Sequence, residues 1–222
     1  FAAETEYLHL IPHDDLVQSD FFGRLIPELE PAVGCALAYS AYSVVGDTGE
    51  PLSSSDLRCP HPIDAAGTAV RISLQTFLRA QAEMHTICMP AVLMKTNRRS
   101  LPLEFSPGYI QSGDVVFYAQ FAPHCERIVE VRAPLCQYRR HLDSVTSKNQ
   151  ADPAVLLRDI WKGMEAVMDV QEEHDVGGWL WRHRQRCRLA AIARVLAGQT
   201  RADLPAGGLM ELYNAGREMA GP

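Results

Sequence analysis

The alternation of apolar and polar residues at the start of the chain predicts a short strand that ends in acidic residues. Apolar residues within 8–11 precede Pro12, which cannot donate a hydrogen bond to a neighbouring strand and ends the run. His-Asp-Asp at 13–15 projects beyond it, and a helix is predicted to begin near residue 19. Because open α/β sheets bind ligands at the carboxyl ends of their strands, this edge is a candidate site.

The same patterning predicts the remaining elements. Apolar and β-branched runs indicate strands over 35–45, closed by a Gly-Asp-Thr-Gly turn, over 89–95, and from the residue after Pro134 to about 141. Apolar residues at helical spacing indicate helices over 68–84, from Asp114 to about 121, from Asp152-Pro153 onward, and over 176–196. The Ser- and Pro-rich stretch 51–62 is typical of a surface loop.

These elements predict an α/β domain over 1–148, followed by a helical C-terminal extension over 149–222. The chain has 222 residues, 47% of them hydrophobic and 22% charged, so it is long enough to bury a sizeable core. The net charge of −6 argues against non-specific binding of nucleic acid.

The cysteines indicate a reducing compartment. The six are scattered and show no Cys-x-x-Cys spacing, so we expect reduced thiols and no disulfide framework. The Cys and His residues near 59–61 and 124–125 lack a matching second pair, which argues against a zinc site. No stretch approaches the roughly 20 apolar residues of a membrane span, and no secretory signal is visible. We therefore expect a cytoplasmic protein.

Four segments, taken in order, resemble the family-2 glycosyltransferases of the GT-A type. Pro12-His-Asp-Asp15 is similar to the metal-binding D-x-D region, with Pro12 in place of the first Asp. The strand at 35–45 and the segment 89–95, which ends in the basic Lys95, are similar to two family strands, the second of which lies near the acceptor. The stretch from Ser112-Gly-Asp114 to Tyr138-Arg-Arg-His141 and Ser144 resembles the end of the family domain. The resemblance covers about residues 3–148.

This resemblance implies a fold, a reaction and a set of site residues. The fold would be a GT-A-like mixed sheet flanked by helices, with the first nucleotide-binding strands absent and a partner or a longer chain covering that surface. The reaction would be inverting transfer of a sugar from a UDP- or GDP-sugar to a hydroxyl acceptor, a glycan or lipid-linked molecule of cell-envelope polysaccharide. Asp14 and His141 would hold Mn²⁺ or Mg²⁺, Asp15 and Arg140 would contact the nucleotide sugar, and Asp114 would be the catalytic base.

The chemistry of transfer explains why these residue types are needed. A leaving diphosphate accumulates negative charge, which a divalent cation on carboxylate oxygens neutralises. An acceptor hydroxyl needs a base such as Asp114. Because adjacent strand residues point to opposite faces, only one of Arg139 and Arg140 can face the cleft. We predict that Asp14 and Asp114 lie across one cleft, at the carboxyl ends of neighbouring strands.

Alternatives to each of these assignments stay open. Asp114 can serve as a helix N-cap, and Asp14 can cap the helix after it. Pro12 and Gly113, which stand where the family has Asp and Glu, fit a non-catalytic binding or assembly module. A metal-dependent hydrolase built on residues 13–15 is a third function.

The C-terminal extension offers a separate expectation. The helix over 179–196 carries several arginines beside tryptophans and leucines. It either lies on the anionic inner face of a membrane as a peripheral contact or packs its apolar face on the domain, and we favour the second interpretation.

Overall fold

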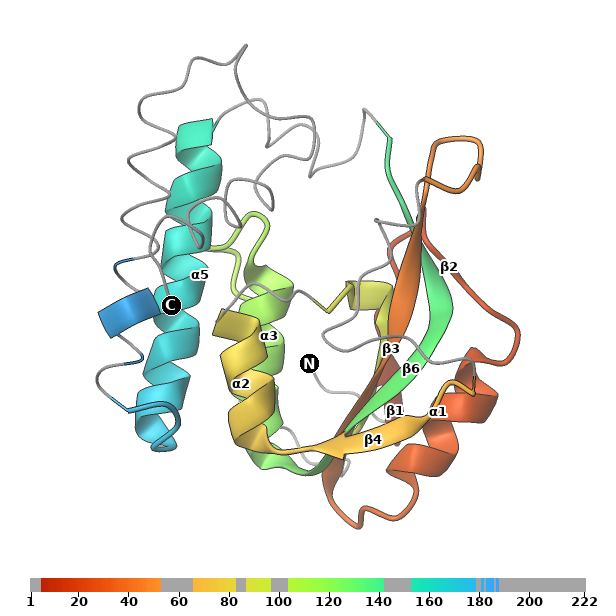
Figure 1. Ribbon diagram of the computed structural model, residues 1–222, viewed down its shortest axis with the longest axis horizontal. Coiled ribbons are helices and arrows are strands. Elements are labelled where there is room, and N and C mark those ends of the chain that lie inside the picture. Colours follow the sequence, from red (N-terminus) through yellow and green to blue (C-terminus); the bar gives the residue numbers. More distant parts are fainter. Residues whose placement is uncertain are drawn as a thin grey trace.

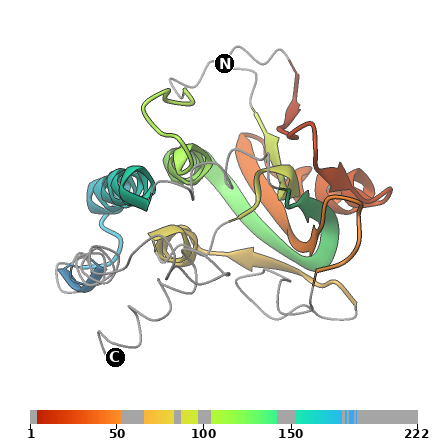
Figure 2. The ribbon, with the colours of Figure 1, turned by 90° about the horizontal axis from the view of Figure 1, so that it is seen from above.

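The computed structural model describes residues 5–52, 66–82, 87–96, 104–141 and 153–178, together with the positions 181, 183–185 and 187. It is a mixed α/β structure in which a curled sheet lies between helices (Figure 1). Helix α1 covers one face of the sheet, and α2 and α3 cover the other, with α5 packed outside them (Figure 2). The predicted α/β class is confirmed.

The sheet contains six strands among the described residues. They are β1 (Tyr7–His9), β2 (Leu16–Val17), β3 (Cys35–Val45), β4 (Ala69–Ile72), β5 (Val92–Lys95) and β6 (Cys125–Arg139). Their order is β1-β5-β3-β6-β2, and β4 also pairs with β6. The long strands β3 and β6 run parallel, whereas every other pairing is antiparallel. The ends of β3 and β6 therefore lie side by side at Val45 and Arg139.

The central strand β3 is buried on both faces, which is why its sequence is an almost continuous apolar run. Leu37 and Tyr39 point into the core beneath α2 and α3. Ala36 and Ala38 point to the other face, where their small side chains accommodate α1. The alternation of large and small residues along one strand thus matches two different layers.

The structure gives bounds for four helices and two short 3₁₀ turns. The helices are α1 (Phe21–Leu29), α2 (Leu74–Ala82), α3 (Gly113–Phe121) and α5 (Pro153–Glu173), and the turns are η2 (Met89–Ala91) and η3 (Ala122–His124). Helix α5 contributes Val167 and Val170 to the same hydrophobic cluster as α2, α3 and β3. Helix α5, the longest described part of the predicted C-terminal extension, therefore packs on the core.

Several predicted elements are confirmed, and some boundaries are wrong. The strand at 35–45 and the helices near 114 and 153 are present. The last strand begins at Cys125 and not after Pro134, because a register irregularity in the pairing with β3 accommodates the proline. The first strand ends at His9, before Pro12, and β2 precedes α1 where a direct helix start was expected.

The predicted helix over 68–84 is wrong in its first part. Residues 69–72 form β4, whose side chains alternate between exposed and half-buried and which pairs with β6. The Oγ of Ser73 accepts the backbone N–H of Thr76 at 3.0 Å, so Ser73 caps α2, which starts after it.

Parts of the chain that carried expectations lie outside the described residues. These are most of the loop at 51–62, Ser144, Asp152, and the tail after 187. Of the segment 179–196, only residues 181, 183–185 and 187 are described, and these are helical.

Two glycine-to-alanine substitutions are expected to change stability in opposite directions. In α5, a Cβ at Gly163 would lie 2.5 Å from the Cβ and Oγ of the buried Ser112, so Gly163→Ala should destabilise by about 1–3 kcal/mol. In α1, a Cβ at Gly23 would meet nothing within 4 Å, so Gly23→Ala should stabilise by up to about 1 kcal/mol. Urea denaturation of both variants measures this difference, and a stabilised Gly163→Ala would contradict the packing of α5 on the turn before α3.

Candidate functional site

The acidic pair Asp14-Asp15 is held beside the end of β6. Strand β2 starts at the next residue and pairs antiparallel with β6, with Leu16 opposite Gln137. The backbone N–H of Arg139 donates to Oδ1 of Asp15 at 2.8 Å. Asp15 therefore points inward, and its side chain is anchored to β6.

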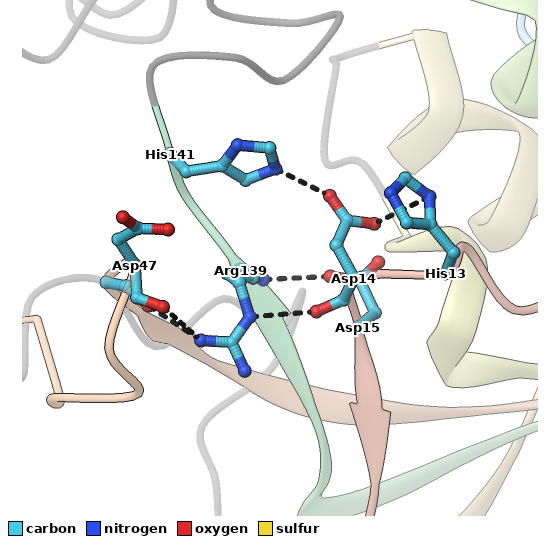
Figure 3. A network of polar contacts seen from close by, with 7 residues as sticks. His13, Asp14, Asp15, Asp47, Arg139 and His141 are labelled. Carbon is cyan, nitrogen blue, oxygen red and sulfur yellow. Dashed lines mark hydrogen bonds and ion pairs between the residues drawn. The ribbon is translucent and has the colours of Figure 1, made fainter.

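The guanidinium of Arg139 joins two loops at this edge of the sheet (Figure 3). Its Nε donates to the backbone oxygen of Asp14 at 3.0 Å. Its Nη1 donates to the backbone oxygens of Gly46 at 3.1 Å and Asp47 at 2.7 Å, in the turn after β3. Arg139 therefore holds the acidic loop against this turn.

Arg140 occupies a different environment. Its backbone N–H donates to the oxygen of Val45 at 2.8 Å, which extends the pairing of β3 with β6. Its side chain is half-buried and has no hydrogen bond or ion pair with any residue in the described ranges. Of the two neighbouring arginines, Arg140 is the one whose charge is available to an anion.

Asp14 and His141 meet across 127 positions of sequence. The Nε2 of His141 lies 2.9 Å from Oδ2 of Asp14, and the exposed His13 lies on the other side of the carboxylate, with Nδ1 3.9 Å from Oδ1 (Figure 3). Partial burial acts to raise the pKa of Asp14, but the hydrogen bond with His141 and the nearby histidine charges outweigh it, so the net shift is downward. Asp14 is therefore ionised near neutral pH.

The donor set formed by Asp14 and His141 is small. Within the described ranges, no three His, Cys, Asp or Glu residues gather in a way that would hold a metal ion. A cation at Asp14 and His141 would therefore need oxygen atoms from a bound ligand to complete its coordination.

Asp15 is 5% exposed, and its pKa is raised to about 6. Burial is the main cause, and the charge of Asp14 adds to it, whereas the N–H of Arg139 acts in the opposite direction. The two adjacent carboxyl groups therefore differ in basicity.

Asp114 lies in the first turn of α3. Its Oδ1 accepts the backbone N–H of Val115 at 2.8 Å, and burial raises its pKa to about 6, with a smaller contribution from the charge of Asp159. The amides of 110–112, just before the helix, donate to Asp159 of α5 and not to Asp114. The Asp114 carboxylate therefore accepts a backbone amide of the first helical turn, and a pKa of about 6 suits a proton acceptor near neutral pH.

The thiol of Cys88 senses the charges of both acidic regions, at Asp15 and at Asp114. It lies just before η2, and its thiol contacts that of Cys136 on β6. Burial raises the pKa of the Cys88 thiol, and the charges of both Asp15 and Asp114 raise it further. Both carboxylates therefore lie near one side chain; whether Asp14 and Asp114 face each other across one cleft stays a prediction.

Lys95 does not lie near this site, contrary to the expectation for the strand at 89–95. It pairs with Tyr7 and Ala36, close to the starts of β1 and β3, whereas the acidic pair follows the end of β1. Its Nζ donates to the backbone oxygens of Ala32 at 2.7 Å and Glu30 at 3.3 Å, beyond the C-terminus of α1. Lys95 is a buried structural cation, and the segment's opposite end, at Cys88 and η2, lies near the acidic residues.

The sequence did not reveal two features of the site. One is the Arg139 clamp, by which we mean the hydrogen bonds of its guanidinium to the backbone oxygens of Asp14, Gly46 and Asp47, and the other is the carboxylate of Asp159. The alternation rule showed that one arginine must point inward but not which one. No local signal marks Asp159, because its partners precede it by almost fifty positions.

A comparison of the sequence with protein-family models finds no match, and a comparison with curated proteins finds no relative. Among the helices of the described ranges, none has the length and apolarity required to traverse a lipid bilayer.

Proposed function

We propose that this chain transfers a sugar from a nucleotide-sugar donor to a hydroxyl acceptor with the help of a divalent cation, on a GT-A-like fold. The observation that supports this most directly is the contact of Asp14 with His141, which follows Arg140 in the sequence at the end of β6. A carboxylate and a cationic group at one sheet edge suit a metal-bound diphosphate.

In this proposal the residues at the end of β6 bind the donor. Asp14, with neutral His141, holds Mn²⁺ or Mg²⁺, and the guanidinium of Arg140 contacts the diphosphate. When bound, the cation neutralises charge on the leaving diphosphate. Arg139 keeps the acidic loop in place, and the inward-facing Asp15 orients groups around the sugar.

Asp114 takes the proton of the acceptor hydroxyl. A carboxyl group with a pKa of about 6 is mostly ionised at pH 7 and more basic than an ordinary aspartate, as a general base requires. The acceptor is a hydroxyl of a glycan or a lipid-linked molecule, as the resemblance implies.

Calorimetric titration tests the metal and donor site together. Mn²⁺ should bind weakly to the chain alone, and its affinity should rise about tenfold or more when UDP or GDP is present, because diphosphate oxygens complete the coordination. Asp14→Asn should remove this enhancement, because the principal oxygen ligand is lost.

The control is Asp169→Asn, which neutralises an exposed carboxylate on α5 and should bind as the wild type does. Failure of both nucleotides to increase metal affinity would contradict the proposal. Tight binding of Zn²⁺ by the chain alone would instead support the metal-dependent hydrolase.

A further inference from the structure

Helix α5 supplies a carboxylate to the turn that precedes α3. Oδ1 of Asp159 accepts the N–H of Ile110 at 2.7 Å, and Oδ2 accepts those of Gln111 at 2.9 Å and Ser112 at 2.8 Å. The hydroxyl of Ser112 lies 2.9 Å from Oδ2 as well. Asp159 is only 5% exposed, so one buried side chain organises three consecutive amides.

The hydrogen bonds keep this buried carboxylate charged. Burial acts to raise the pKa of Asp159, but the three N–H donors and the Ser112 hydroxyl outweigh it, and the net shift is downward. The negative charge of Asp159 therefore lies against Ser112, which precedes Asp114 by two residues. The pKa values of the two carboxyl groups near the start of α3 are therefore shifted in opposite directions. That of Asp159 is lowered, which favours the charged form, and that of Asp114 is raised, which favours the neutral form.

We propose that Asp159 is a positioning residue for Asp114: it holds the turn at 110–112 rigid and thereby places the Asp114 carboxyl at the first turn of α3. This inference rests on the proposed function, in which Asp114 is the base. The hydrogen bonds of Asp159 do not depend on that function.

The groups around Asp114 define what a substitution should change. Asp159 comes from α5, Cys88 from the segment before η2, and Tyr118 from α3 itself. Burial raises the pKa values of both Cys88 and Tyr118, and the charge of Asp114 adds to this, so these two side chains stay neutral near pH 7. Asp159 is thus the charged neighbour that acts on Asp114.

The test is Asp159→Asn in the full chain, with carboxyl carbon NMR to follow the titration of Asp114. The asparagine side chain has no charge, and its NH₂ group would face the backbone N–H groups of the turn. Because the charge of Asp159 raises the pKa of Asp114, that pKa should fall measurably from about 6 when the charge is removed. Turnover should fall on the order of ten- to a hundredfold, with the KM for the donor nearly unchanged. Asp169→Asn on the same helix is the control and should alter neither quantity.

The outcomes separate the two proposals. A lower melting temperature with an unchanged Asp114 titration and unchanged turnover would make Asp159 merely structural and overturn the inference.

If Asp159→Asn does not fold, Ser112→Ala replaces it, because this variant loosens the turn but keeps the charge. It should lower kcat severalfold, and an unchanged kcat would overturn the inference. A wild-type chain without transfer activity whose Asp114 titration still responds to Asp159→Asn would remove the proposed function but leave the electrostatic effect of Asp159 on Asp114 intact.

Discussion

Asp114→Asn is expected to lower turnover by about a hundredfold or more, because an amide cannot accept the proton of the acceptor hydroxyl. The variant should fold normally. Its side-chain oxygen can still accept the N–H of Val115, and an uncharged group replaces one whose ionisation is disfavoured by burial. Steady-state transfer assays and thermal unfolding check these two expectations.

The pH dependence of transfer follows from the same group. The pKa of Asp114 is about 6, above the ordinary value for aspartate, and the base acts only when it is ionised. The rate should therefore rise with pH up to about 6 and level off above it. In Asp114→Asn this rise should disappear.

Near-normal transfer by Asp114→Asn would show that Asp114 only caps α3. Asp15 would then be the next residue to substitute, because its pKa is also raised to about 6. Donor binding supplies the internal control, since the affinity for the metal–nucleotide complex should be the same in both proteins.

The second large effect is expected at Arg139 and Arg140, which are adjacent but should respond in different assays. Arg139→Met removes three hydrogen bonds from a charged donor to the loops at Asp14 and 46–47, and should destabilise by about 2–4 kcal/mol. Arg140→Met removes a side chain without such partners in the described ranges, so its stability should change by less than about 0.5 kcal/mol.

Donor affinity should show the opposite order. Arg140→Met should weaken binding of UDP or GDP with Mn²⁺ by about ten- to a hundredfold, because a charge-assisted contact to the diphosphate is lost. Chemical denaturation and calorimetry of the two variants measure both quantities. Equal nucleotide affinity in wild type and Arg140→Met would remove Arg140 from the donor site, and an unaltered stability of Arg139→Met would show that the clamp does not hold the loops.

Local sequence predicted the elements whose signals are strong and continuous. The apolar run of β3 needs burial on both faces, and Pro153 at the start of α5 suits a first helical turn. It did not predict β2 or β4, which have two and four residues, because such short strands are stable only through their pairing with β6.

The residues of the candidate site were likewise only partly predictable from the sequence. The acidic pair after an apolar strand could be identified without the fold, because two adjacent carboxyl groups do not fit the apolar pattern of a strand. The resemblance implied that Asp14 and His141 bind a metal together, and this stays a prediction; the short distance between the two side chains follows from the pairing of β2 with β6.

The sequence by itself determined the α/β class, the principal strands and helices, and the acidic residues that define the candidate site, because these depend on local periodicity and residue chemistry. Only the tertiary structure decided that Arg139 holds two loops together while the side chain of Arg140 has no hydrogen bond or ion pair within the described ranges, that Lys95 lies at the far end of the sheet, and that Asp159 organises the turn before Asp114. These depend on strand register and helix packing, which bring together residues between about 50 and 90 positions apart and leave no local pattern.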